Sequence, residues 1–179
     1  MQPIKKLMKS NAITMMCILA ASLCHAQEKN VYAETLARLS LKADSLSGDE
    51  YAAFNKKHFQ REIILLPYVR YFKADHLLIS LQENSDHKFD RFSFQNKYDF
   101  YKGLERWPTP GLATLVDTTV VQAGNAQYLV VRFHLLGEAY LSFFSELYNT
   151  DKYLFGKIKC RAEDIPSARE FLKTILPEP

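Results

Sequence analysis

The C-terminal half of the chain contains four consecutive segments with the composition and spacing of β-strands. They cover residues 114–123, 127–135, 139–148 and 152–161. Gly124-Asn125 separates the first two segments as a two-residue hairpin turn, and Asn149-Thr150-Asp151 indicates another turn. Strands so close in sequence usually pair with their neighbours, so this half predicts an antiparallel meander.

The turns also predict which side chains share a face of this meander. A turn at 124–125 places Val131 on an apolar face, and a three-residue loop over 136–138 pairs Val131 with Phe143. The last hairpin then pairs Phe143 with Ile158. Apolar side chains therefore gather on one side, and we expect that side to be buried and the other to be solvated.

The N-terminal third has helical periodicity. Apolar side chains recur at spacings of three and four, at Tyr32, Leu36, Leu39, Ala43 and Leu46. A second helix begins at Ser47, which has capping-box spacing to Glu50. Its pattern continues to Leu66, where Pro67 must end or kink it, but residues 60–72 also suit a buried strand.

The remaining segments complete an α+β pattern. Residues 76–82 predict a strand, and 96–107 a short aromatic helix or irregular segment. Asp164 can cap a final helix with Pro166 in its first turn. The apolar face of that helix comprises Ile165, Ala168, Phe171, Leu172, Ile175 and Leu176. We therefore predict N-terminal helices and a C-terminal helix on one face of an antiparallel sheet of at least four strands.

This order of elements, helices first and a long antiparallel meander last, resembles the cone-shaped α+β roll of the nuclear transport factor 2 type. The resemblance lies in the architecture, and such rolls include both enzymes and binding modules. It therefore implies a fold and leaves the function open.

The first 26 residues have the pattern of an export signal. Lys5, Lys6 and Lys9 precede an apolar run over 12–23, and Cys24-His25-Ala26 provides a small-x-small cleavage pattern before Gln27. The run is shorter than the roughly 20 residues of a membrane-spanning helix. We expect cleavage between Ala26 and Gln27, leaving residues 27–179 as one domain. The protein would then be exported, periplasmic or secreted, and the lack of an Asn-x-Ser/Thr site favours a bacterial origin.

Charge and cysteine content limit the partners of this mature segment. Three of the 23 basic residues lie in segment 1–26 and all 20 acidic residues lie beyond it, so the mature segment carries 20 of each sign. Such a neutral chain gives no electrostatic reason to expect nucleic acid. Cys160 is the one cysteine beyond residue 26, which excludes an intramolecular disulfide and a cysteine zinc cluster. We expect no cofactor, no metal and no membrane span in the mature protein.

Two groups of polar residues are candidate sites. The predicted register places one group together on the solvated face of the sheet: Asp117, Arg132, His134, Tyr140, Ser142 and Lys159. They would line a pocket if the sheet curls, or form ordinary cross-strand ion pairs on a wet face. His58 and Glu62, four residues apart, could form a tuned general base or an ordinary pair at the margin of a helix.

The chain contains no Gly-x-Ser-x-Gly elbow, phosphate loop, His-Glu-x-x-His or calcium loop. We therefore predict an exported non-catalytic binding or accessory domain, with an unknown protein or small-molecule partner in the cell envelope or outside the cell. The alternative is an enzyme or small-molecule binder that uses the polar face around His134. A carrier of an apolar ligand is a third class, and it would require an empty aromatic cavity.

Overall fold

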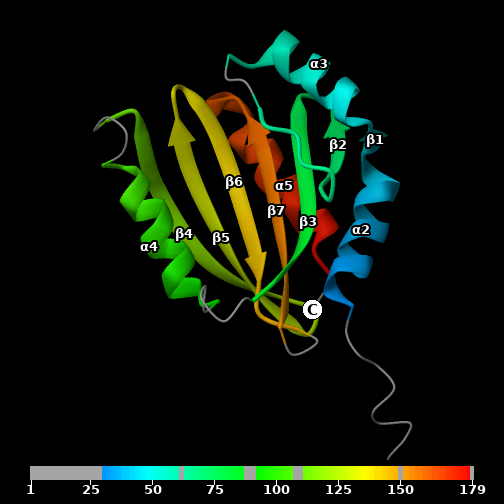
Figure 1. The fold of residues 1–179 in the computed structure, drawn as a ribbon, viewed down its shortest axis with the longest axis vertical. Coiled ribbons are helices and arrows are strands. Elements are labelled where there is room, and N and C mark those ends of the chain that lie inside the picture. The colour runs from blue at the N-terminus through cyan, green and yellow to red at the C-terminus, as the bar shows by residue number, and fades with distance from the viewer. Residues whose placement is uncertain (1–29, 61–62, 87–91, 107–110, 149–150, 178–179) are drawn as a thin grey trace, which may run out of the picture.

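The computed structural model describes residues 30–60, 63–86, 92–106, 111–148 and 151–177. These residues form an α+β domain of four α-helices and one seven-stranded antiparallel sheet (Figure 1). The helices are α2 (Val31–Lys42), α3 (Gly48–His58), α4 (Phe94–Leu104) and α5 (Ile165–Ile175). The strands are β1 (Asp44–Leu46), β2 (Arg70–Ala74), β3 (Leu77–Ser85), β4 (Ala113–Ala123), β5 (Ala126–Leu135), β6 (Glu138–Ser145) and β7 (Lys152–Cys160).

The strand order is β1-β2-β3-β7-β6-β5-β4. The predicted meander therefore forms one half of the sheet, and β7 joins it to the hairpin of β2 and β3. The structure confirms the predicted α+β class, with helices near both ends of the described residues and an antiparallel sheet of more than four strands. The likeness to a nuclear transport factor 2 roll stays a prediction.

Helices α2 and α5 pack on one face of the sheet. In Figure 1, α5 lies behind the sheet and α2 lies along its side. The predicted apolar face of α5 is confirmed, because Ile165, Ala168, Leu172 and Ile175 are all buried. They meet a core that includes Leu141 and other fully buried side chains of the sheet. This face is therefore a continuous hydrophobic core.

The opposite face is also covered, which corrects the expectation of a solvated side. Helix α4 packs against β4 and β5 on this face, and its Tyr101 joins a second buried cluster with Val131 and Phe133. Every residue of β6 is buried, whichever face it is on. Both faces of β6 are thus removed from water.

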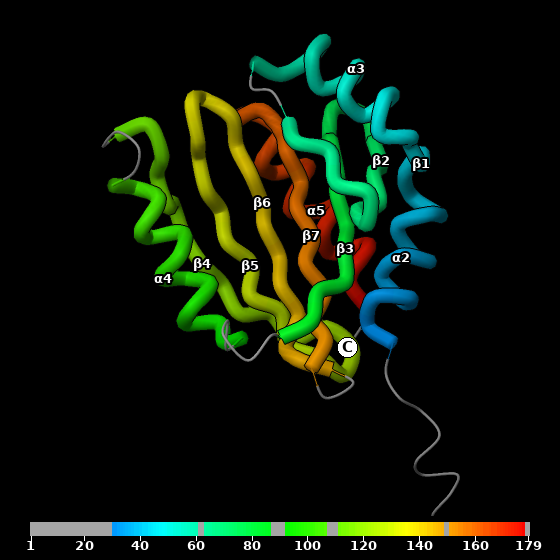
Figure 2. Tube along the Cα trace, viewed as in Figure 1, coloured from blue at the N-terminus to red at the C-terminus, as the bar shows by residue number. Residues whose placement is uncertain are grey.

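The capping box of α3 forms as predicted, because Ser47 and Glu50 bond each other's backbone amides. The helix ends at His58, however, eight residues before the predicted end at Leu66. Residues 63–69 then form neither helix nor strand and cross in front of the sheet (Figure 2). The side chain of Ile64 is 87% exposed, so the apolar run at 63–66 does not form a buried element.

The register is correct at the first hairpin and wrong at the second. Asp117 pairs with Arg132 as predicted. The β5–β6 connection, however, is a two-residue turn at Leu136-Gly137, so Val131 pairs with Ser142 and not with Phe143. Leu136 and Gly137 both take positive φ, 53° and 80°, as a tight hairpin turn demands. Leucine rarely adopts this conformation, and for this reason the sequence favoured a longer loop.

The β6–β7 pairing differs from the prediction by two residues, because Leu141 pairs with Ile158. A shift of two preserves the faces, whereas the shift of one between β5 and β6 reverses every side chain of β6 relative to β5. The second error is therefore the one that matters for the site.

Candidate functional site

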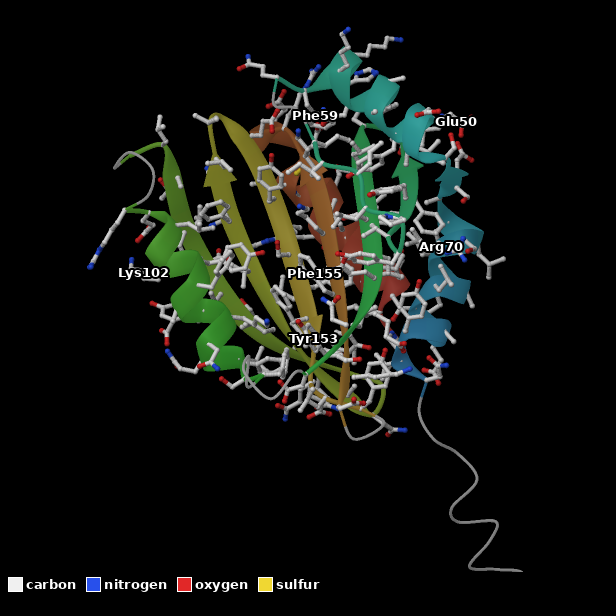
Figure 3. The ribbon with its side chains drawn as sticks, in the orientation of Figure 1. Glu50, Phe59, Arg70, Lys102, Tyr153 and Phe155 are labelled. Atoms are coloured by element: carbon white, nitrogen blue, oxygen red, sulfur yellow. The ribbon has the colours of Figure 1, made fainter. Side chains whose placement is uncertain are left out.

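A pocket of about 520 Å³ lies on the sheet face that α4 partly covers. Its floor is formed by β3, β7, β6 and β5, and its walls by α4 on one side and segment 63–69 on the other. Most of the lining is apolar or aromatic, including Ile64, Leu66, Phe100, Leu104, Phe133 and Phe155. Phe155 lies near the centre of this face in Figure 3, between α4 and β3. This volume is within the range of about 300–1,000 Å³ that small-molecule pockets occupy.

A row of polar side chains crosses the floor of the pocket. Ser80 on β3 pairs with Lys157 on β7, which pairs with Ser142 on β6, and all three line the pocket. Directly paired residues on one face have side chains about 5 Å apart at their Cβ atoms. We call Ser80, Lys157 and Ser142 the polar row. The pocket thus combines an apolar surface with a few polar groups at its centre.

Helix α4 orients one end of the polar row. The hydroxyl of Tyr101 donates a hydrogen bond of 2.6 Å to Oγ of Ser142. Burial raises the pKa of Tyr101 to about 12, although the bond to Ser142 acts in the other direction. The phenol therefore stays protonated at neutral pH, and the Ser142 hydroxyl keeps its own hydrogen for another acceptor.

A buried ionic network lies beside the pocket and shares Tyr140 and Lys159 with its lining. Oε2 of Glu138 accepts from Nζ of Lys159 at 2.8 Å and from the hydroxyl of Tyr140 at 2.6 Å. Nζ of Lys159 also donates to Oδ1 of Asn55 on α3 at 2.7 Å, and Oε1 of Glu138 accepts from the amide of Gln60 at 2.8 Å.

The Glu138 and Lys159 side chains are 7% and 2% exposed, so each charge is compensated by the other inside the protein. The ammonium of Lys159 also lies 4.7 Å from the ring centroid of Phe59, which Figure 3 shows beneath α3. Together these contacts fix the chain that leaves α3 against the sheet. This chain continues into segment 63–69, so the network positions one wall of the pocket.

The sheet separates the six residues of the first predicted site. Tyr140, Ser142 and Lys159 line the pocket. Asp117, Arg132 and His134 lie on the other face, with α5, because of the two-residue turn at 136–137. Lys159 is also deeply buried, not on a wet face as predicted. A single constellation of all six is therefore ruled out by the register.

On the α5 face, Asp117 has two arginine partners. Arg132 lies 2.7 Å from Oδ2 of Asp117, and Arg169 of α5 lies 2.9 Å from the same oxygen. These side chains are partly exposed, so the cluster is an ordinary surface network that connects α5 to β4 and β5. His134, also partly exposed, pairs across the strands with Ala139 and Thr114.

Of the second predicted pair, His58 and Glu62, the structure describes His58, and residue 62 lies outside the described residues. His58 is the last residue of α3 and stacks on Phe54 with a centroid separation of 4.3 Å. Desolvation lowers its pKa, and Lys57, Arg161 and His76 contribute in the same direction. The helix ends here, so it does not extend to hold Glu62 at helical spacing. A role of the pair as a general base remains an untested prediction.

Cys160 is buried beside Ala139, on the same face as Leu141. Burial raises the pKa of its thiol to about 12, with further contributions from Asp164 and Glu163. The thiol is therefore protonated at neutral pH and packs as a small apolar side chain.

Several pocket residues were missed by the sequence reasoning, namely Ser80, Lys157, Tyr101 and Phe155. One signal was present, because Phe155, Lys157 and Lys159 alternate along a predicted strand and must share a face. No local pattern indicated that Ser80 lines the pocket. Its position depends on the pairing of β3 with β7, two strands separated by nearly half the chain.

Within the described ranges, no helix has the length and apolar character needed to cross a membrane. Nor do these residues bring together three or more His, Cys, Asp or Glu side chains that could hold a metal ion. The polar row and the Glu138 network are therefore the sites that the described residues offer for comparison with known chemistry.

No protein-family description matches this sequence, and no curated protein matches it. Among solved structures, the chain is similar to the solution structure of cyanobacterial PsbP (CyanoP) from Synechocystis sp. PCC 6803. The sequences are 12% identical, the TM-score is 0.42, and the match covers 62% of this chain and 72% of the other. At this level of similarity, conclusions about the site rest on its own geometry.

Proposed function

We propose that the protein is an exported, non-catalytic binding domain that holds a small, largely apolar molecule in the pocket between α4 and segment 63–69. The observation that supports this most strongly is the pocket itself, about 520 Å³ in volume with aromatic and aliphatic walls and a polar row at its centre. Pockets of this composition bury most of the surface of a small ligand and orient it by a few polar contacts.

The rim of the pocket supports the same proposal. Phe100 on α4 and Ile64 on the facing segment line the pocket and are 60% and 87% exposed. Apolar side chains exposed together at an opening mark binding surfaces in soluble proteins. An apolar ligand would therefore meet apolar side chains on both sides as it enters.

The geometry favours binding over catalysis. An enzyme of the kind considered above would need Asp117, Arg132, His134 and Tyr140 to converge on a substrate. The sheet stands between Tyr140 and the other three. Cys160, the one candidate nucleophilic thiol, has a pKa of about 12 and faces the α2–α5 core.

Calorimetric titration with 1-octanol tests the proposal, because this probe is apolar and uncharged. We expect saturable binding near one equivalent to the protein that begins at Gln27. Leu135→Trp should abolish binding, since Leu135 lines the pocket and indole would occupy its volume. Val120→Trp is the matched control on β4, where the side chain is 54% exposed and outside the pocket. Absence of saturable binding, or equal loss in both variants with both folded, would contradict the proposal.

A further inference from the structure

We infer that the ligand of this pocket is an apolar carboxylate whose head group binds at the polar row, with Lys157 as its main partner. The inference rests on the proposed function, because it names the chemical class of the molecule that the pocket takes. It depends on the row formed by Ser80, Lys157 and Ser142, and on the buried network beside that row.

The polar row consists of hydrogen-bond donors. An ammonium carries three N–H donors and no acceptor, so Lys157 can donate to a ligand oxygen in addition to its contacts within the protein. Ser142 accepts from Tyr101 at 2.6 Å, and its own hydrogen is then directed to another acceptor. Ser80 adds a hydroxyl on the opposite side of Lys157. A ligand that satisfies this row must present oxygen acceptors to a cation.

The charges of the lining favour an anion. Among the described residues that line the pocket, two are lysines and none is acidic. Lys159 is neutralised by Glu138 at 2.8 Å and bonded to Asn55 at 2.7 Å. Lys157 lies at the centre of the polar row, where its ammonium can donate a charge-assisted hydrogen bond to the carboxylate of a ligand. Charge-assisted hydrogen bonds of this kind are roughly twice as strong as neutral ones.

Apolar surface surrounds the row, as the body of such a ligand requires. Phe155 precedes Lys157 by two positions on the same face of β7, and Phe133 pairs with Tyr140 next to the row. Leu104 and Phe100 contribute from α4. The body of the ligand would pack against these side chains while its carboxylate lies over the floor.

The experiment compares octanoate with 1-octanol, two probes with similar chains that differ in head group. At neutral pH the protein should bind octanoate about tenfold to a hundredfold more tightly than 1-octanol, as a hydrogen bond to a charged group predicts. Lys157→Met should remove this preference and leave the affinity for 1-octanol unchanged, while Lys157→Arg should retain most of it. Lys73→Met, on β2 and outside the pocket lining, is the control and should bind both probes as the original chain does.

The outcomes separate this inference from the proposed function. Equal affinity for the two probes, or a preference for octanoate that survives in Lys157→Met, would overturn the carboxylate inference while the pocket still binds apolar molecules. If neither probe binds, the proposed function and the carboxylate inference both fall. Circular dichroism of each variant shows whether a loss of binding reflects unfolding.

Discussion

The side chain of Phe143 lies directly across Gly156, its partner on β7, and is fully buried in the α2–α5 core. A Cβ atom at residue 156 would overlap with the outer edge of the Phe143 ring. Glycine is therefore required here for space and not for an unusual backbone angle. This contact keeps β6 and β7 close together beneath the pocket floor.

Gly156→Ala should consequently destabilise the protein by about 1–3 kcal/mol or more, the usual range for an overpacked core. Urea unfolding followed by circular dichroism measures the change. The double variant Gly156→Ala/Phe143→Leu should recover part of the loss, because a smaller side chain makes room for the added methyl group. If Gly156→Ala unfolds at the same urea concentration as the original chain, this account of the contact is wrong.

The buried pair of Glu138 and Lys159 provides a second prediction for single residues. Lys159→Met leaves the Glu138 carboxylate buried without its cation and should cost about 3–5 kcal/mol. Glu138→Gln/Lys159→Met removes both charges and should be more stable than Lys159→Met. Urea unfolding of the original chain and these two variants, with Glu138→Gln to complete the cycle, measures the coupling. Additive effects would show that the two charges do not compensate each other.

At the scale of elements, the position of α4 depends on its aromatic side chains. Tyr101 packs edge-on against Phe133, and its hydroxyl donates directly to Ser142 on the pocket floor. Because α4 forms one wall, this contact helps to set the width of the pocket. The buried phenol also makes the stability of the fold depend on pH.

Burial raises the pKa of both Tyr101 and Tyr128 from 10.0 to about 12. Between these values the unfolded chain loses protons that the folded chain keeps, so stability should fall as pH rises through this window. Tyr101→Phe should make that fall less steep, and Tyr68→Phe, at a 62% exposed position, is the control. Urea unfolding at neutral pH and at about pH 11 measures both. A constant stability over this range would contradict the burial of these phenols.

The extent to which the fold follows from sequence also depends on its elements. Strands β4 to β7 and helix α5 have clear periodicity and turn residues, and they form where expected. The β5–β6 turn was misjudged because it places Leu136 at φ 53°, which a leucine adopts only when the surrounding sheet imposes it. That single residue reversed the faces of β6 and led to the mistaken grouping of His134 with Tyr140.

At the scale of the whole molecule, the pocket results from contacts distant in sequence. The floor needs β3 beside β7, one wall is α4, and the other wall is the irregular segment after α3. Local patterns do not report such pairings, so the sequence alone could predict a binding domain but not the location of its pocket. The fully buried Lys159 was equally hidden, since its partner Asn55 is on a different element over a hundred residues away.

Export is a prediction for the whole chain. We expect the mature protein to begin at Gln27, because the preceding segment has the pattern of a removable signal. Intact-mass spectrometry of the protein from the periplasm or medium measures this directly. A mass that includes residues 1–26, or a diacylglycerol on Cys24, would contradict the predicted cleavage.

The most direct test of the central claim is an amide NMR titration of the mature protein with 1-octanol. If the pocket is the binding site, resonances of Ser80, Ser142 and Lys157 should shift together and saturate near one equivalent. Those of Ala168 and Leu172, on the buried face of α5, should stay in place. Shifts centred on α5, or shifts that never saturate, would show that the space between α4 and segment 63–69 is not a ligand site.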